Sequence, residues 1–361
     1  MSAEQDMDSQ QATFPLSPPQ IAGFWQEFLG RLPALEALSG VEFVESANDL
    51  LHPIAPGLSL EREEPGQDPA GRLVVTAHGS IEQFENVQAL VRQAPPIPGY
   101  ALQAFRSRNL GGSFAMRMQD FELSCADVLV AHYDAGGVVG LELGFGKTIP
   151  QDMRDHARHM AFIMLDHVLG EWDFAVRVGP VDFVEGFSGE PVPLSDFVPV
   201  FDAFMHEALG RSYELPAEQD ESWMMLEVRG REASADAPPD LLSFRASANA
   251  VATRADLPYF VTLELGFESQ EQLDQVRDAQ DALGSELERL HLGLLVFTRV
   301  QQMSARVAAC YVSDAQAATA LMQHLATQYA PAIEAQVAVA YDPAWQEFLG
   351  LYAAVSADAQ D

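Results

Sequence analysis

Three histidines lie close together in a segment that the sequence predicts to be helical. His156 and His159 are about one helical turn apart, and His167 follows eleven residues after His156. Imidazole is a common metal ligand, so one helix could supply two ligands here. His167 would lie about 16 Å further along the helix, too far to complete the site. The HExxH pattern is absent, so a metal protein or hydrolase using His156 and His159 is one hypothesis, and a solvated helix face is the other.

Other patterns that carry chemistry are weak. The segment 140–148 (GLELGFGKT) resembles a phosphate-binding loop, but five residues separate Gly140 from Gly146 where that loop needs four. A strand leading into a helix is the favoured interpretation. Cys125 and Cys310 lie far apart in apolar, strand-like segments, which excludes a disulfide framework or a cysteine zinc site and favours inert core thiols. We therefore expect no catalytic residue and no cofactor.

The hexapeptide WQEFLG occurs twice, at 25–30 and at 345–350. In each copy the aromatic residues fall on one face of a short helix. This spacing makes Trp25, Phe28, Trp345 and Phe348 candidate partner-binding residues. The alternative is that each copy packs its aromatic face against its own part of the protein.

Charge is the strongest signal in the chain. The sequence has 53 acidic and 20 basic residues, a net charge of −33, and Lys147 is its only lysine. Such a chain repels phosphate backbones and anionic lipids and attracts basic proteins. No arginine cluster stands clear of the acidic residues, so we expect a basic protein partner, no nucleic acid and no membrane. Adaptation to a salty cytoplasm or a genomic composition bias would give the same charge without a partner.

Hydropathy and the N-terminal residues predict the location. No apolar run approaches the roughly 20 residues that span a bilayer. Residues 1–19 contain three acids and no basic residue, unlike a secretory signal. A cytoplasmic location is the expectation.

Periodicity predicts an α+β fold with two units. In the second, strands at 259–267, 292–300, 306–312 and 333–341 alternate with helices at 269–289 and 313–329. This order is β-α-β-β-α-β, the ferredoxin-like motif. The first unit repeats the pattern with extra strands: its strands are at 72–77, 100–106, 114–118, 127–133, 138–145, 174–178 and 181–184, and its helices are at 80–93 and 152–169. We expect mostly antiparallel sheets with helices on one face.

Proline-rich and acidic stretches predict the boundaries. The predicted organisation is a disordered tail at 1–20, a first domain at 21–189, a linker at 190–220 with a short helix near 196–209, a second domain at 221–354 and a tail at 355–361.

Four segments carry a family resemblance: 72–79 (RLVVTAHG), 97–106 (IPGYALQAFR), 169–173 (LGEWD) and 341–345 (YDPAW). Together they resemble an uncharacterised bacterial family, a domain of unknown function whose members are sometimes joined to a module like the ribonuclease E inhibitor B protein. That inhibitor is a small, acidic, ferredoxin-like protein that blocks a nuclease. The resemblance implies no catalytic residues, and it favours an acidic inhibitor over an enzyme.

These observations lead to three hypotheses. The first is a non-enzymatic, acidic protein-binding module, such as an inhibitor or immunity-type regulator of a basic nuclease or another nucleic-acid-binding protein. The second is the metal protein or hydrolase built on His156 and His159. The third is a structural or housekeeping protein whose acidity is adaptive only.

Overall fold

The protein has an α+β fold with mostly antiparallel sheets, as the sequence predicts. The computed structural model describes residues 15–63, 71–109, 114–118, 121–229 and 238–358. The chain forms two compact units: residues 1–132 with 141–198, and residues 133–140 with 199–361. The division after residue 198 falls inside the predicted linker, within helix α5 (Phe197–Glu207). The grouping of residues 133–140 with the second unit has no counterpart in the sequence analysis.

The first unit begins with two helices, α1 (Pro18–Leu35) and α2 (Gly40–Leu51). Ser17 precedes two prolines in the first turn of α1, an arrangement that favours helix initiation. The predicted disordered tail at 1–20 is therefore too long. Residues 1–14 lie outside the described residues, but Leu16 is buried and its backbone N–H donates to Asn86 Oδ1 at 2.7 Å. This contact anchors the chain just before the helix.

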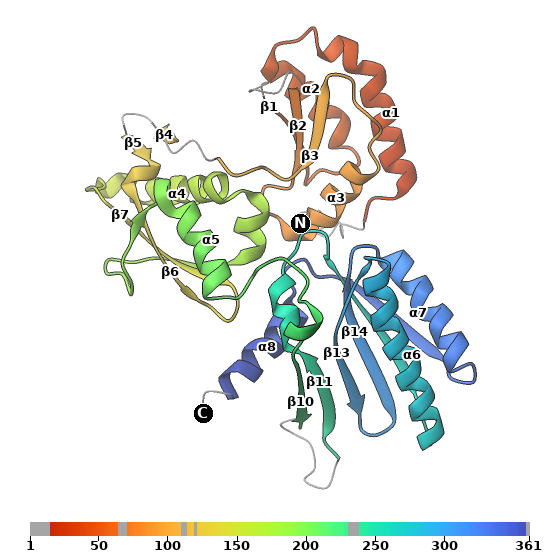
Figure 1. The fold of residues 1–361 in the computed structure, drawn as a ribbon. Helices are drawn as coiled ribbons and strands as arrows, with labels where there is room; N and C mark the ends of the chain where they lie inside the picture. The colour runs from red at the N-terminus through yellow and green to blue at the C-terminus, as the bar shows by residue number, and fades with distance from the viewer. Residues whose placement is uncertain (1–14, 64–70, 110–113, 119–120, 230–237, 359–361) are drawn as a thin grey trace, which may run out of the picture. The chain divides into compact units, whose positions relative to one another are not determined.

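A three-stranded sheet follows these helices, in the order β1-β2-β3 (Figure 1). Its strands are β1 (Ser59–Glu63), β2 (Gly71–Thr76) and β3 (Tyr100–Ala104). β1 pairs antiparallel with β2, whereas β2 and β3 are parallel. Helix α3 (Phe84–Arg92) connects the parallel pair, since a crossover returns the chain in the same direction.

The rest of the first unit contains two further sheets and helix α4 (Arg154–Leu169). Strands β4 (Ala115–Met118) and β5 (Phe121–Ser124) form one sheet, and the order of the other is β8-β7-β6-β9. The latter four are β6 (Val128–Asp134), β7 (Val139–Phe145), β8 (Val178–Phe183) and β9 (Val192–Pro193). The first unit thus differs from the expected arrangement of one sheet with helices on one face. The predicted strand 174–178 is also wrong, because Asp173–Arg177 form a π-helical turn directly after α4.

The second unit has one six-stranded sheet in the order β10-β11-β13-β14-β12-β15, and all its strand pairs are antiparallel. Its strands are β10 (Trp223–Val228), β11 (Asp240–Arg245), β12 (Tyr259–Gly266), β13 (Gly293–Gln301), β14 (Ala305–Val312) and β15 (Ala335–Tyr341). Its long helices are α6 (Gln270–Arg289), α7 (Ala315–Tyr329) and α8 (Gln346–Asp358). From β12 to β15 the elements follow the order that periodicity predicts. The β10–β11 hairpin, which extends the sheet beyond β13, is an addition that the sequence analysis lacks.

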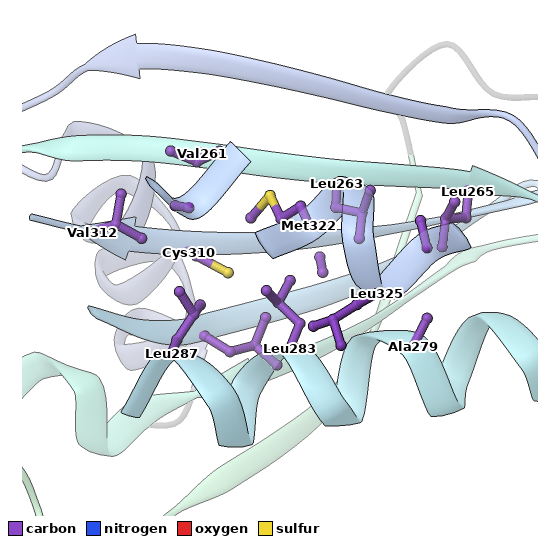
Figure 2. Close-up of a cluster of buried hydrophobic side chains, with 14 of the residues drawn as sticks. Val261, Leu263, Leu265, Ala279, Leu283, Leu287, Cys310, Val312, Met322 and Leu325 are labelled. Carbon is purple, nitrogen blue, oxygen red and sulfur yellow. The ribbon is translucent and has the colours of Figure 1, made fainter. Parts of the chain in front are cut away.

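Each face of this sheet has its own apolar core. Figure 2 shows side chains of α6 such as Leu283 and Leu287 directed toward Val261 and Leu263 of β12, with Met322 of α7 beside them. The opposite face packs Phe244, Tyr311, Trp345 and Phe348 in a second cluster. Helices therefore lie on both faces of the sheet rather than on one, because the short helix Ala246–Val251 and the α8 segment cover the second face.

Among the helices in the described ranges, none is both long enough and apolar enough to cross a membrane.

Candidate functional site

The two histidines of the metal hypothesis, His156 and His159, lie apart from other side chains that could bind a metal ion in the described part of the chain. His156 and His159 both lie on the exposed side of α4. Within residues 15–63, 71–109, 114–118, 121–229 and 238–358, no group of three histidine, cysteine, aspartate or glutamate side chains is placed to hold a metal ion. His167 belongs to another environment, where its ring lies 5.1 Å from that of Phe114. The structure thus leaves the metal hypothesis without a third ligand.

The two copies of WQEFLG are core segments. Trp25 and Phe28 are 1% and 0% exposed, and Trp345 and Phe348 are both 0% exposed. The expectation that these residues bind a partner is therefore corrected: the aromatic side chains of both copies are buried and pack the protein's own interior.

The two copies share side-chain contacts although their backbones differ: Trp25 lies within α1, whereas Trp345, at φ +55°, directly precedes α8. Trp25 Nε1 donates to the Leu90 carbonyl at 2.9 Å, and Trp345 Nε1 donates to the Leu257 carbonyl at 3.0 Å. In each copy the tryptophan and phenylalanine rings meet edge to face, with centroids 5.6 Å and 5.7 Å apart. One hexapeptide thus makes the same aromatic pair in two different surroundings, at α1 and at the start of α8.

The segment 140–148 is a strand and its exit, as the residue spacing indicates. Strand β7 contains Gly140 and Gly144, and a β-carbon on either would clash with an aromatic ring. At Gly140 the ring belongs to Tyr133, and at Gly144 it belongs to Phe187, whose closest approach is 2.6 Å. The glycines therefore make room for side chains rather than cradling a phosphate.

A polar cluster in the first unit surrounds the buried side chain of Glu171. Its carboxylate accepts hydrogen bonds from the Thr76 hydroxyl (2.7 Å) and from the backbone N–H groups of Ala77 (2.9 Å), Gly79 (3.1 Å) and Arg106 (3.2 Å). Gly170, at φ +79°, ends α4 just before it. A β-carbon there would lie 3.0 Å from the backbone nitrogen of Arg108, so the close approach requires glycine.

Arg106 connects this cluster to two more acids. Its guanidinium contacts Asp166 at 2.5 Å and Glu61 at 3.1 Å. Burial alone would lower the pKa of Arg106, but the neighbouring carboxylates outweigh it and raise that pKa. Burial raises the pKa of Asp166 above its ordinary value, against the opposing effect of Arg106. The arginine therefore stays charged and serves as the counterion of this acidic pocket.

A histidine and a serine next to Arg106 resemble a catalytic dyad in distance only. His78 Nε2 lies 3.1 Å from Ser59 Oγ, and His78 Nδ1 lies 3.2 Å from an Arg106 nitrogen. A guanidinium can only donate, so Nδ1 must accept and Nε2 carries the proton of the neutral ring. Nε2–H then donates to Ser59, so the imidazole is not oriented to take the serine proton.

Sequence reasoning did not single out Glu171 or Arg106, although a signal was present. Thr76, Ala77 and Gly79 end the first of the family-like segments, Arg106 ends the second, and Glu171 is the central residue of the third. The structure brings these three segments together at one carboxylate. In the fourth segment, Asp342 accepts from the Tyr311 hydroxyl at 2.5 Å, and the Trp345 ring stacks on Tyr311 at 3.8 Å. The quoted motifs therefore carry structural contacts.

The cysteines and the acidic residues complete the survey of reactive groups. Burial raises the pKa of Cys125 to about 11 and also raises that of Cys310, so both thiols stay protonated and unreactive. Helix α6 has six acidic residues and only two basic ones, and most of the acidic residues lie on its solvent-exposed side. Arg277 and Arg289 contact acids of the same helix, Asp274 at 3.4 Å and Glu286 at 2.6 Å. Because both arginines pair with acids of α6 itself, the solvent-exposed face of this helix keeps a net negative charge.

Comparison of the chain with protein-family models, curated proteins and solved structures finds no match.

Proposed function

We propose that this protein is a non-enzymatic binding module that engages a basic protein through its acidic exterior. The observation that carries the proposal is the exposed face of α6, in a chain of net charge −33. Glu271, Asp274 and Asp278 are exposed there, and both arginines of the helix are already paired with its own acids. Complementary potential of this kind accelerates encounter with a basic partner and disfavours acidic ones.

The order of elements in the second unit is a second argument for the proposal. Elements β12 to β15 follow the order β-α-β-β-α-β, and their strands lie in the order β13-β14-β12-β15. We propose that residues 259–341 form a ferredoxin-like unit, to which β10 and β11 add an edge. Together with the resemblance of four segments to the family with inhibitor-like fusions, this favours an inhibitor or immunity-type regulator of a basic nuclease. Fold likeness alone does not specify the partner.

Capture of a partner at two salt concentrations tests the proposal. The full chain is immobilised and exposed to a lysate of its source cell at about 50 mM and about 500 mM NaCl, since screening weakens exposed charge pairs. We expect a discrete basic protein that is retained at low salt and released at high salt. The purified partner is then titrated against the protein to measure Kd.

Two triple variants separate a specific face from general acidity. The first neutralises α6: Glu271→Gln, Asp274→Asn and Asp278→Asn. The matched control neutralises three exposed acids of the first unit: Glu36→Gln, Glu45→Gln and Asp49→Asn. We expect the α6 variant to weaken binding by roughly tenfold or more and the control by much less. Equal weakening, or failure to retain any discrete basic protein, would overturn the proposal in favour of adaptive acidity.

A further inference from the structure

The first unit has a groove of about 390 Å³ whose lining is mainly positive, whereas the protein as a whole is strongly negative. The end of β7, the start of α4, and β8 with the loop after it form its walls. Lys147, Arg154 and Arg158 line it, with Glu185 as the one carboxylate among its lining residues. The whole chain has 20 basic residues against 53 acidic ones, so three cations around one groove are a local reversal of sign.

The two arginines are placed where a helix does not favour them. Arg154 and Arg158 are four residues apart, so they share one face of α4 at its N-terminal end. Positive side chains there oppose the helix dipole. Arg158 reaches its nearest carboxylate, Asp155, only at 3.9 Å, and no ion pair joins Arg154 to any described residue. Lys147, in contrast, is held by Asp127 at 2.8 Å. The arginines therefore keep positive charge available at the groove.

Aromatic rings form the apolar part of the same groove. Phe145 and Phe183 stack with centroids 5.8 Å apart, and the Arg158 guanidinium lies 5.4 Å from the Phe183 ring centroid. Phe187 lies against Gly144, in the space that a β-carbon would occupy. Flat apolar surfaces thus lie beside the cationic groups.

The loop that supplies Glu185 and Phe187 is tied to β7 on both sides. Val184 N–H donates to the Leu143 carbonyl at 2.9 Å, and Ser188 N–H donates to the Glu142 carboxylate at 2.7 Å. This wall is therefore formed before any ligand arrives, as in most small-molecule sites.

We propose that the groove binds a nucleoside monophosphate. Arg154 and Arg158 would bind the phosphate, as paired guanidinium groups do, and the base would lie against the phenylalanine rings. Glu185 would accept a hydrogen bond from an N–H group of the base. The volume lies within the usual range for small-molecule sites, roughly 300–1,000 Å³. Although the strand at 140–148 borders the groove, the phosphate donors are the arginines of α4 rather than a glycine-rich loop.

Calorimetric titration of the full-length protein with five probes tests the proposal: GMP, AMP, guanosine, phenyl phosphate and inorganic phosphate. We expect at least one nucleotide to bind roughly tenfold or more tightly than guanosine and inorganic phosphate, because each of these lacks half of the contacts. Phenyl phosphate has no N–H donor, so it should bind more weakly than the preferred nucleotide. This comparison uses the unmodified chain and does not depend on the folding of a variant.

A pair of arginine variants locates the binding. Arg154→Gln/Arg158→Gln should weaken the preferred nucleotide by roughly tenfold or more, since two charge-assisted contacts are lost. The control Arg277→Gln/Arg289→Gln makes the same change in net charge on α6 and should leave the affinity unchanged. Absence of nucleotide binding, equal affinity for phenyl phosphate, or equal weakening in both variants would overturn the assignment.

Discussion

Single buried side chains fix the loops of the first unit. Glu171 is the clearest case, because one carboxylate accepts four hydrogen bonds from segments about 65 to 95 residues away in sequence. Where β2 ends and the chain turns, no neighbouring strand of the described chain accepts hydrogen bonds from the backbone N–H groups of Ala77 and Gly79. The buried carboxylate accepts them instead. Arg106 supplies the positive charge that such a site needs.

Replacement of Glu171 by alanine should destabilise the protein by about 3 kcal/mol, because it leaves several buried donors without an acceptor. Urea unfolding followed by circular dichroism measures the change. Glu82→Ala removes an exposed acid near the same loop and should cost about 0.5 kcal/mol or less. A loss below about 1 kcal/mol in Glu171→Ala would show that water replaces the carboxylate easily.

At the scale of elements, periodicity predicts what is local and regular. The strands and helices from β12 to β15 match their predicted ranges closely, because each has a strong period of two or 3.6 residues. The sequence analysis expected only a short helix at 25–30 where α1 lies, and it missed α2, β1 and the β10–β11 hairpin. Strand β10 has exposed Trp223 and Met225 on one side, so its apolar content gives no clean alternation. At 174–178 an apolar run that suits a strand continues from α4 as a π-helical turn.

The candidate site was harder to predict than the elements. Residue type and spacing pointed to His156 and His159 and to the aromatic residues of WQEFLG. The histidines lie on an exposed surface without a third ligand among the described residues, and the aromatic residues are buried. The groove at the start of α4 draws residues from 143 to 187, and no short motif connects Arg154 with Phe187. Long-range proximity of this kind comes from strand pairing, which a single sequence does not specify.

The repeated hexapeptide allows a matched pair of substitutions. Trp25→Phe and Trp345→Phe each remove an indole N–H that donates to a buried carbonyl, and each leaves a smaller ring in the core. We expect both to destabilise the protein by about 1–3 kcal/mol. Thermal unfolding of the two variants provides the measurement. An effect at only one position would contradict the equivalence of the two copies, and Gln26→Ala and Gln346→Ala, at the exposed second position of each copy, are the matched controls.

At the scale of the whole molecule, charge governs both stability and recognition. A net charge of −33 repels itself in the folded state, and the arginines offset only part of it through local pairs such as Arg299 with Asp240. Hydrogen bonds from the Gln302 backbone N–H and from Arg299 lower the pKa of Asp240, so this carboxylate remains charged as the pH falls into the acidic range. Its contribution to stability is present above its unfolded-state pKa and is lost only at lower pH.

Salt should therefore act in opposite directions on folding and on binding. We expect Tm to rise by several degrees between about 20 mM and 500 mM NaCl, because screening relieves self-repulsion. Choline chloride at equal ionic strength serves as the control and should give a similar rise. An unchanged or lower Tm would mean that surface pairing already neutralises the repulsion. A further rise toward molar salt would favour adaptation to a salty cytoplasm.

Burial of both WQEFLG copies has a practical consequence. An antibody raised against the free hexapeptide would need the tryptophan and phenylalanine that the folded chain encloses, while the denatured chain offers the epitope twice. Such an antibody would bind the unfolded chain and not the native protein, so its signal would measure the unfolded fraction in a sample.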